Sequence, residues 1–453
     1  MDKVRETALN ALYKIDEKEA YSNIALDEII KENRNKLDER DIGFISEIVY
    51  GVTTWKLTID EIIKKYSKIR LKKISPWILN ILRMGIYQIV FLDKVPKSAS
   101  VNESVNLAKR YGHKSSSNFV NAILRKIDKK DYKEFFELKD DVERISKTTS
   151  MPIWIIEELL KENDIKKVEE ICRCSNVRPK VAIRVNNLKT NKEELAELLK
   201  GRKIEFKEGV LEDFFILKNV KNIENLDLFK EGFFTIQDEG AGLIALIVEP
   251  QSNEIILDAC SSPGGKTTYM AELMKNRGKI LAWDLHEHRV SLVEENAKRL
   301  GIDIIEAKCE DATVFKQDYV EMFDKILLDV PCLGLGVLKR KPDIKWKRKR
   351  EDIAEITKVQ EKILHTCSRY LKPNGQIIYS TCSIIKDENE KVIEKFLEKN
   401  RNFDYGEIDI RNYINNDKSI FFNNNKNMEK CHKIQLFQDE ENDGFFMCKL
   451  QKK

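Results

Sequence analysis

The sequence predicts an α/β protein in which a C-terminal, doubly wound Rossmann-like domain follows a small α+β module and an all-α N-terminal domain. Three observations predict this architecture. The 453 residues suggest about three domains at about 150 residues each. In the first third of the chain, apolar residues recur at helical intervals, whereas the last part alternates short apolar runs with amphipathic stretches.

The first domain, residues 1–140, is expected to be a helical bundle. Its apolar residues fall three or four positions apart and lack the alternation of strands. The positions are Ala8, Ala11, Leu12, Ile15, Ile78, Leu82, Ile86, Val101, Val105 and Ala108. Residues 126–141 are highly charged, which fits a linker or a solvated helix.

The middle region, residues 141–235, is predicted to form a small α+β domain. Helical patterns cover residues 154–163 and 192–200, and a strand-like run covers residues 181–186. Further short apolar runs follow before residue 235. This mixture differs from both flanking regions and indicates a separate module.

Residues 236–453 are predicted to form a parallel sheet covered by helices on both faces. The expected strands are residues 254–258, 279–283, 302–307, 325–329 and 376–380, with a final strand at 444–450. The expected helices are residues 265–275, 288–300 and 353–371, and residues 415–427 are expected to be a surface loop. Ligands of such sheets bind beyond the carboxyl ends of the strands, so the residues after each strand are candidates for chemistry.

The composition is that of a soluble globular protein. Lys and Arg number 80 and Asp and Glu number 76, which gives a net charge of +4, and 34% of the residues are charged. No apolar run is long enough to cross a membrane and no signal peptide is recognisable, so we expect a cytoplasmic protein. The nine cysteines contain no Cys-x-x-Cys pair and the five histidines do not cluster with them, which predicts neither disulfides nor a metal site.

The turn after the first strand, Asp258-Ala-Cys-Ser-Ser-Pro-Gly-Gly-Lys-Thr-Thr268, admits two interpretations. Gly265-Lys266-Thr267 imitates the end of a phosphate-binding loop, but Cys260 stands where that motif needs glycine. The alternative is a strand-turn-helix whose glycines let a small cofactor approach the backbone. A tight turn without a ligand is the plainest explanation of a lone pair of glycines.

Two further acids follow the next two strands and favour a nucleoside cofactor. Asp284 is placed to bind ribose hydroxyls, and Asp311 could meet an adenine amino group. Because Gly-x-Gly-x-x-Gly is missing, S-adenosylmethionine fits better than NAD. The sequence therefore predicts a binding site for S-adenosylmethionine.

Two cysteines follow the fourth and fifth strands, where substrate would approach. Cys332 lies in Asp329-Val-Pro-Cys332, and Cys382 lies in Ser380-Thr-Cys-Ser383. A single cysteine at either place would more often be structural. A thiolate there suits carbon 5 of cytosine as a methyl acceptor, because addition at carbon 6 makes carbon 5 nucleophilic. An acid near N3 then stabilises the adduct, and a base removes the proton from carbon 5.

These motifs resemble those of the RNA cytosine-C5 methyltransferases called the NOL1/NOP2/Sun family. The N-terminal segments Arg5 to Leu9, Pro76 to Gly85, Val101 to Val105 and Phe119 to Arg125 resemble the NusB-like helical domain. This combination is similar to the bacterial Sun, Fmu or RsmB branch of the family. The resemblance implies a middle domain like an RNA-recognition motif and a 16S rRNA methyltransferase that acts on cytosine 967.

The resemblance also implies roles for individual residues. Cys382 becomes the attacking nucleophile, Cys332 the cysteine that assists product release, and Asp329 an acid that faces both cofactor and cytosine. The cofactor pocket is expected to contain Cys260, Ser261, Ser262, Pro263, Gly264, Gly265, Lys266, Asp284, Asp311 and Asp329. Leu333 and Ser150-Met151-Pro152 depart from the usual family pattern but do not affect the nucleophile.

A basic run after Cys332 is predicted to contact RNA. Eight of the twelve residues between positions 339 and 350 are basic. The candidate RNA-binding residues are Lys339, Arg340, Lys345, Trp346, Lys347 and Arg348. A solvated helix face is the alternative explanation.

The sequence thus predicts a monomeric methyltransferase that uses S-adenosylmethionine and acts on 16S rRNA, with no metal and no membrane partner. The alternative is a non-catalytic RNA-binding or antitermination module with a degenerate methyltransferase domain.

Overall fold

The computed structural model describes residues 2–220, 222–414 and 431–453, so the loop expected at residues 415–427 lies outside the described residues. The chain forms two compact units. The helical unit comprises the chain up to Val177 together with Leu338–Arg350. The sheet unit comprises Arg178–Val337 and Glu351–Lys453. The helical unit thus extends past residue 140 and includes a segment from within the predicted C-terminal domain. The division into three domains at residues 140 and 235 stays a prediction.

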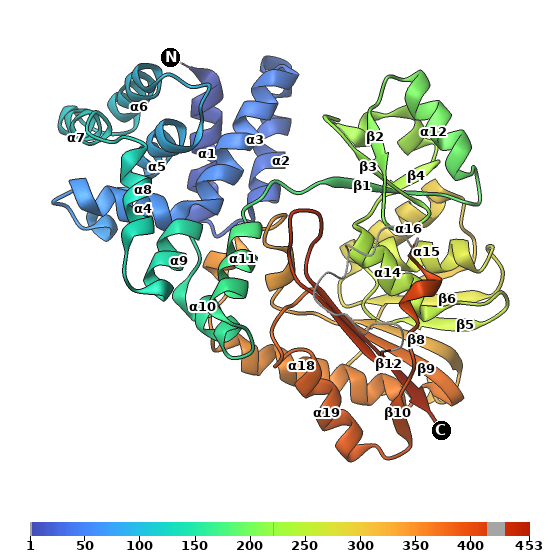
Figure 1. Ribbon diagram of the computed structural model, residues 1–453. Helices are drawn as coiled ribbons and strands as arrows, with labels where there is room; N and C mark the ends of the chain where they lie inside the picture. The colour runs from blue at the N-terminus through green and yellow to red at the C-terminus, as the bar shows by residue number, and fades with distance from the viewer. Residues whose placement is uncertain (1, 221, 415–430) are drawn as a thin grey trace. The chain divides into compact units, whose positions relative to one another are not determined.

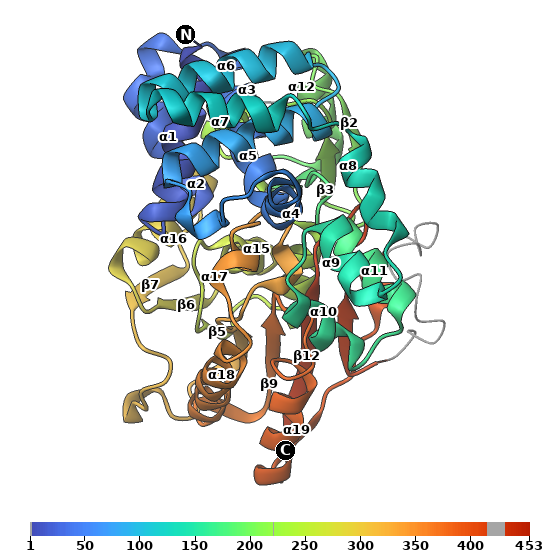
Figure 2. The same cartoon turned by 90° about the vertical axis from the view of Figure 1, so that its left-hand side faces the viewer.

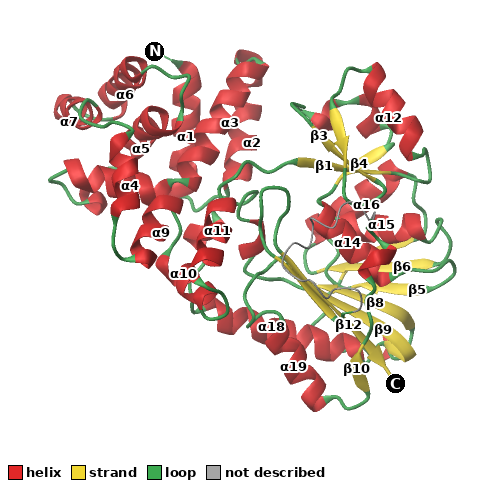
Figure 3. Ribbon diagram, viewed as in Figure 1, coloured by secondary structure: helices red, strands yellow, loops and turns green. Residues whose placement is uncertain are grey.

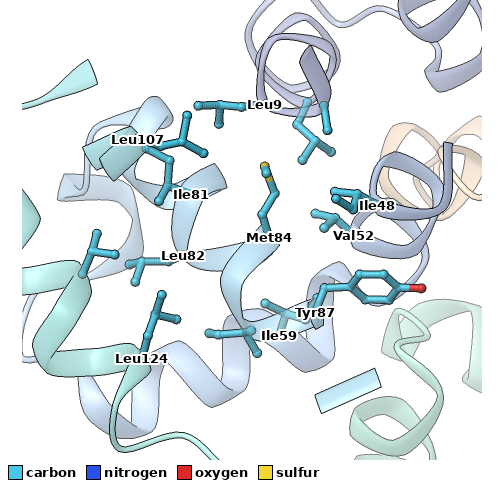
Figure 4. Close-up of a cluster of buried hydrophobic side chains, with 14 of the residues drawn as sticks. Leu9, Ile48, Val52, Ile59, Ile81, Leu82, Met84, Tyr87, Leu107 and Leu124 are labelled. Atoms are coloured by element: carbon cyan, nitrogen blue, oxygen red, sulfur yellow. The ribbon is translucent and has the colours of Figure 1, made fainter. Parts of the chain in front are cut away.

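The helical unit is built around α5 (Pro76–Phe91), which is buried on nearly every side (Figure 1). A helix that is apolar all round belongs at the centre of a bundle. Figure 4 shows Met84 of α5 among side chains from the surrounding helices. These neighbours are α1 (Lys3–Glu17), α3 (Glu39–Thr54), α4 (Lys56–Tyr66), α6 (Lys97–Tyr111) and α7 (Lys114–Leu124). Helix α2 (Ser22–Asn33) packs on α1 and α3. The predicted all-α domain is confirmed.

The stretch after this bundle continues the helical unit instead of starting a new one. It contains α8 (Lys130–Lys133), α9 (Asp141–Thr149), α10 (Ile153–Leu160) and α11 (Ile165–Cys174). The hydroxyl of Thr58 in α4 donates to the carbonyl of Lys147 in α9 at 2.7 Å. The backbone N–H of Leu57 donates to the Ser150 hydroxyl at 3.0 Å. These bonds attach α9 to α4, and the sequence pattern contains no sign of them.

The sheet unit begins with a four-stranded antiparallel sheet of order β2-β3-β1-β4. Its strands are β1 (Val181–Val185), β2 (Phe206–Glu208), β3 (Phe214–Leu217) and β4 (Phe234–Ile236). Two helices accompany it, α12 (Lys192–Gly201) and α13 (Asp227–Lys230). Leu195 and Leu199 of α12 are fully buried against the sheet residues, which gives this module its own core.

The larger sheet has the strand order β10-β12-β9-β8-β5-β6-β7, with β11 paired to β12. Figure 3 shows most of these strands as neighbouring yellow arrows. Its strands are β5 (Ile255–Asp258), β6 (Lys279–Asp284), β7 (Ile305–Cys309), β8 (Phe323–Asp329), β9 (Leu371–Thr381), β10 (Phe403–Tyr405), β11 (Lys433–Leu436) and β12 (Phe445–Lys452). Neighbours among β5 to β9 run parallel, whereas β10, β11 and β12 pair antiparallel. The predicted parallel sheet is thus the larger part of a mixed one.

Helices cover both faces of this sheet (Figures 1 and 2). One face carries α14 (Glu239–Val248), α15 (Gly265–Leu273) and α16 (Glu287–Leu300), and the other α18 (Asp352–Ser368) and α19 (Glu390–Lys399). The strand order reverses between β5 and β8, which lie side by side although β6 and β7 separate them in the chain. The carboxyl ends of β5 and β8 therefore meet at a switch point, where such folds bind ligands. Among the described residues, no helix has the length and hydropathy to cross a bilayer.

Candidate active site

The turn after β5 is shaped by two glycines and a buried acid. Gly264 has a φ of +97°, a conformation that favours glycine, and a side chain there would meet the backbone of Val293 at 3.2 Å. The Thr267 hydroxyl donates to Asp258 at 2.7 Å, and the backbone N–H of Ser261 donates to the carbonyl of Trp283 at 2.8 Å. The turn is therefore tied to the ends of both β5 and β6.

Asp258 has an unused acceptor. Its Oδ1 atom is buried and has no hydrogen-bond partner in the structure. Burial raises the pKa of this carboxyl to about 7. Burial also raises the pKa of the neighbouring Cys260 thiol well above its ordinary value, so this cysteine stays neutral. A buried oxygen without a donor, beside glycines and a helix N-terminus, fits a site for a polar small molecule.

Two more acids stand at the carboxyl ends of the neighbouring strands. Asp284 ends β6, is 4% exposed and accepts a hydrogen bond from the N–H of His286 at 3.4 Å. Asp311 follows β7 and accepts from the N–H of Thr313 at 2.8 Å. The N–H of Glu310 donates to the carbonyl of Asp284 at 2.9 Å, which joins the two strand ends. The structure thus places Asp284 and Asp311 at the carboxyl ends of neighbouring strands, with Asp284 on the strand that is bonded to the turn.

Asp329 at the end of β8 is clamped from two sides. Lys266 Nζ donates to Asp329 Oδ2 at 2.7 Å, and Ser380 Oγ donates to Asp329 Oδ1 at 2.9 Å. Burial opposes the ammonium form of Lys266, but the charge and hydrogen bond of Asp329 outweigh it and raise the pKa of Lys266. Asp329 therefore links the turn after β5 to the end of β9.

The two predicted cysteines come together. Cys332 Sγ and Cys382 Sγ lie 2.7 Å apart, both as free thiols. The hydrogen bond with Cys382, together with burial, raises the pKa of Cys332 well above its ordinary value. Cys332 is thus held as a thiol that can donate to the Cys382 sulfur. Within the described residues, no group of three or more His, Cys, Asp or Glu side chains could hold a metal ion.

Backbone contacts bring the two cysteine loops together. The N–H of Gly336 donates to the carbonyl of Cys382 at 2.8 Å. A side chain at Gly336 would come within 2.7 Å of that carbonyl and 2.0 Å of the carbonyl of Gly444. Only glycine allows this approach, which explains the second glycine of the Leu333-Gly-Leu-Gly336 run.

Arg184, a buried residue behind the turn, was not predicted from the sequence. Arg184 of β1 is fully buried and donates to Glu272 at 2.6 Å, to the carbonyl of Gly265 at 3.0 Å and to Thr268 at 3.3 Å. It thereby holds the small sheet against the start of α15. The signal was present in the sequence, because a lone arginine interrupts an otherwise apolar strand, Val181-Ala-Ile-Arg-Val185.

The whole basic run after Cys332 lies in Leu338–Arg350, the segment that belongs to the helical unit. Lys345 is 1% exposed, and its ammonium group donates to Asn176 at 2.5 Å and to the carbonyl of Thr54 at 3.4 Å. Trp346 donates its indole N–H to the carbonyl of Thr53 at 2.7 Å. These two side chains attach the segment to the helices of the same unit, and the assignment of Lys345 and Trp346 to RNA binding stays a prediction.

The remaining candidates of this run are more exposed. The Lys347 ammonium lies 3.7 Å from the centre of the Tyr21 ring and donates to the carbonyl of Glu19, and partial burial lowers its pKa. Lys339, Arg340 and Arg348 are half-buried. The structure therefore leaves a smaller basic group than the sequence suggested.

Comparison with known proteins connects these features to a family. Family models match residues 245–451 ("16S rRNA methyltransferase RsmB/F"), residues 2–129 ("NusB family") and residues 151–224 ("Methyltr_RsmF/B-like, ferredoxin-like domain"). The "Probable ribosomal RNA small subunit methyltransferase B" of Bacillus subtilis is 35% identical over 99% of both chains. The protein of that name from Synechocystis is 34% identical over 88% of this chain and 90% of the relative.

Solved structures agree in fold. "Crystal Structure of PH0851" has a TM-score of 0.80 at 26% identity and covers 98% of both chains. The structure titled "NSun6 from Pyrococcus horikoshii with SFG" has a TM-score of 0.57 at 21% identity, covering 66% of this chain and 98% of the other, and this likeness shows the fold alone.

Fold, site and relatives together define an S-adenosylmethionine-dependent rRNA methyltransferase. The chain belongs to the family of ribosomal RNA small subunit methyltransferase B. This membership argues against the alternative of a non-catalytic module with a degenerate domain.

Proposed function

We propose that this enzyme methylates carbon 5 of a cytosine in 16S rRNA, cytosine 967 in the numbering that the family resemblance implies, through a covalent cysteine adduct. The observation that supports this most is the thiol pair. Cys382 and Cys332 lie 2.7 Å apart, and Asp329 stands at the end of the strand next to Cys382. Two thiols and an acid are the groups that addition to a cytosine ring, and reversal of that addition, require.

The turn of residues 260–266, with Asp284 and Asp311, is proposed to hold S-adenosylmethionine, which supplies an electrophilic methyl group when bound. The free Oδ1 of Asp258 and the glycine turn support this assignment. Asp284 would accept hydrogen bonds from ribose hydroxyls. Lys266 contributes chiefly by holding Asp329, its partner at 2.7 Å.

Cys382 is proposed to attack as a thiolate at carbon 6 of the cytosine, forming a sulfur–carbon bond. Carbon 5 becomes nucleophilic and would take the methyl group from the sulfonium, whose methyl–sulfur bond breaks to leave a neutral thioether. A base removes the proton from carbon 5, the electron pair of that bond restores the ring double bond, and the bond between carbon 6 and Cys382 breaks to release the thiolate. Asp329 can hold a proton at N3 and so stabilise the charge that addition moves onto the ring. Lys266 and Ser380 keep its two oxygens in place.

Cys332 is proposed to act on the leaving sulfur. Its pKa is raised by the hydrogen bond with Cys382 and by burial, so it remains a donor at neutral pH. A thiol that donates to the departing Cys382 thiolate favours breakage of the adduct. Removing this donor should trap the enzyme on its RNA.

The test uses purified enzyme, S-adenosylmethionine and a 16S rRNA fragment, with bisulfite sequencing as the readout. Cys382→Ala should abolish methylation, and Cys332→Ala should accumulate an RNA adduct that migrates slowly on a denaturing gel. Cys431→Ala, a partly exposed cysteine outside both loops, is the matched control and should resemble the wild type. Full turnover by Cys382→Ala would falsify the assigned nucleophile, and methylation at another atom would refute the proposed product.

A further inference from the structure

Glu388 lies between β9 and α19 and is completely buried. Its Oε2 atom accepts the backbone N–H of Leu333 at 2.9 Å and the Nε2 group of Gln360 at 3.1 Å. Its Oε1 atom accepts the hydroxyl of Ser383. Both oxygens of a buried carboxylate are therefore engaged by donors, which offsets part of the cost of removing the charge from water.

The donors come from both cysteine loops. Leu333 directly follows Cys332, and Ser383 directly follows Cys382. Gln360 of α18 also donates to the carbonyl of Pro331 at 2.9 Å, the residue before Cys332. The carboxylate and its glutamine partner thus hold the backbone on both sides of Cys332 and fasten it to the residue after Cys382.

The same region is joined by a second set of bonds. Asn389, next to Glu388, donates to the carbonyl of Ser383 at 3.1 Å and accepts the hydroxyl of Thr381 at 2.6 Å. The hydroxyl of Tyr379 donates to the backbone carbonyl of Glu388 at 2.7 Å. Because these bonds do not use the Glu388 carboxylate, the Cys382 loop keeps several supports when that carboxylate is changed.

We propose that Glu388 is a positioning residue of the methyl-transfer reaction, whose carboxylate sets the distance and orientation between the thiols of Cys332 and Cys382. This inference rests on the proposed function of the two cysteines. The carboxylate acts through the main chain of Leu333 and the side chain of Ser383, to which it is bonded. Displacement of a reacting group by about 1 Å can cost about 100-fold in rate, so a link of this kind controls turnover without binding substrate.

The charge of Glu388 supports the same role. The pKa of Cys332 is raised first by its hydrogen bond with Cys382 and by burial, and the negative charge of Glu388 adds to the effect. A protonated Cys332 is the form that can donate to a Cys382 thiolate. Glu388 thus favours both the position and the protonation state that the thiol pair needs.

The experiment compares Glu388→Ala and Glu388→Gln, with Glu394→Gln as the control on the exposed face of α19. Glutamine can still accept from Leu333 and Gln360 and can donate to the Ser383 oxygen, whereas alanine loses all three links. We expect kcat to fall about 100-fold in Glu388→Ala and less than about tenfold in Glu388→Gln. The KM for RNA and the thermal shift caused by S-adenosylhomocysteine should stay as in the wild type in all three variants.

A second readout separates this inference from the proposed function. RNA with 5-fluorocytosine at the target cannot lose a proton from carbon 5 and should trap the adduct. Wild-type enzyme should form it rapidly and Glu388→Ala slowly, while Glu388→Gln recovers most of the rate. If the wild type forms the adduct but Glu388→Ala matches it in rate and in kcat, the positioning role is wrong and the cysteine mechanism stands. If the wild type forms no adduct, the proposed function itself fails.

Loss of folding is distinguished from loss of positioning by the cofactor. A Glu388→Ala protein that no longer shows a thermal shift with S-adenosylhomocysteine is misfolded, and Gln360→Met, which removes the links to Pro331 and Glu388 from the other side, then replaces it. That variant should lower kcat with unchanged cofactor binding. Wild-type turnover in Gln360→Met would overturn the inference.

Discussion

The two cysteine loops and the basic segment that follows them use their polar groups in opposite ways. In the sheet unit, donors converge on buried or partly buried carboxylates. Asp329 accepts hydrogen bonds from Lys266 and Ser380. Glu388 accepts hydrogen bonds from a residue of each cysteine loop. In Leu338–Arg350, Lys345 and Lys347 instead donate to neutral acceptors of the helical unit, Asn176 for Lys345 and the carbonyl of Glu19 for Lys347. Arg350, at the end of the segment, pairs with Glu157 and Glu158.

The difference lies in what each arrangement can do. A carboxylate held by two donors is fixed in place for a reaction at a defined atom. A lysine that is buried against amide oxygens is removed from water and loses its reach for phosphate. Adjacent stretches of one chain can thus serve chemistry and attachment separately, and charge content alone does not distinguish them.

The largest effect is expected at the clamped acid. Asp329→Asn keeps the shape of the side chain but removes its charge and its capacity to hold a proton at N3. We expect kcat to fall about 100-fold to 10,000-fold, the range for loss of an acid–base group. Methyl-transfer rates at saturating RNA measure the loss, and Asp324→Asn at the far end of the same strand, β8, is the matched control. If kcat stays unchanged and only the KM for RNA rises, Asp329 contributes to binding and not to the chemical step.

The fold of the sheet unit was predictable because its signals are local. Each central strand is a continuous apolar run, and Asp284 and Asp329 mark strand ends by being charged after such a run. The cysteine motifs lie at the same kind of position, so the sequence placed Cys332 and Cys382 at one edge of the sheet. Their 2.7 Å contact follows from the neighbouring positions of β8 and β9, which a parallel sheet favours.

What escaped prediction depends on contacts between distant segments. No local pattern around Lys345 predicts that its ammonium group will donate hydrogen bonds to Asn176 and to the carbonyl of Thr54. The same holds for Thr58, whose bond to Lys147 attaches α9 to the helices before it. Composition averages over such contacts. The basic run therefore looked like one surface although its members have different environments.

A smaller effect is expected when the buried lysine is replaced. Burial lowers the pKa of Lys345 to about 7, whereas the unfolded chain retains the ordinary value of 10.5. Between these pH values the unfolded state binds more protons, so this group makes the free energy of unfolding rise with pH from about 7 to about 10.5. Lys345→Met should remove that rise and change stability at pH 7 by only about 1–2 kcal/mol, since relief of the charge burial is offset by the loss of its hydrogen bonds.

Denaturant unfolding at pH 7, 8.5 and 10 measures this change. Lys341→Met, an exposed position in the same segment, is the control and should leave the pH dependence as it is. If the free energy of unfolding still rises with pH in Lys345→Met, another group causes the rise. The burial of the Lys345 charge would then not distinguish the basic segment from the cysteine loops.

The smallest effect is expected for the half-buried basic residues of the same segment. If Lys339, Arg340 and Arg348 bind phosphates of unpaired RNA, their joint replacement by alanine should flatten the logarithmic salt dependence of RNA binding by up to about 2, at about 0.7 for each phosphate that is no longer neutralised. Lys345→Met should leave that slope unchanged, because the Lys345 ammonium group is buried and hydrogen-bonded to Asn176 and to the carbonyl of Thr54. Filter binding of a 16S rRNA fragment across a salt series measures both slopes. Equal slopes in the triple variant and the wild type would make the whole segment an attachment to the helical unit, whereas a lower slope in Lys345→Met would show that even this lysine reaches RNA.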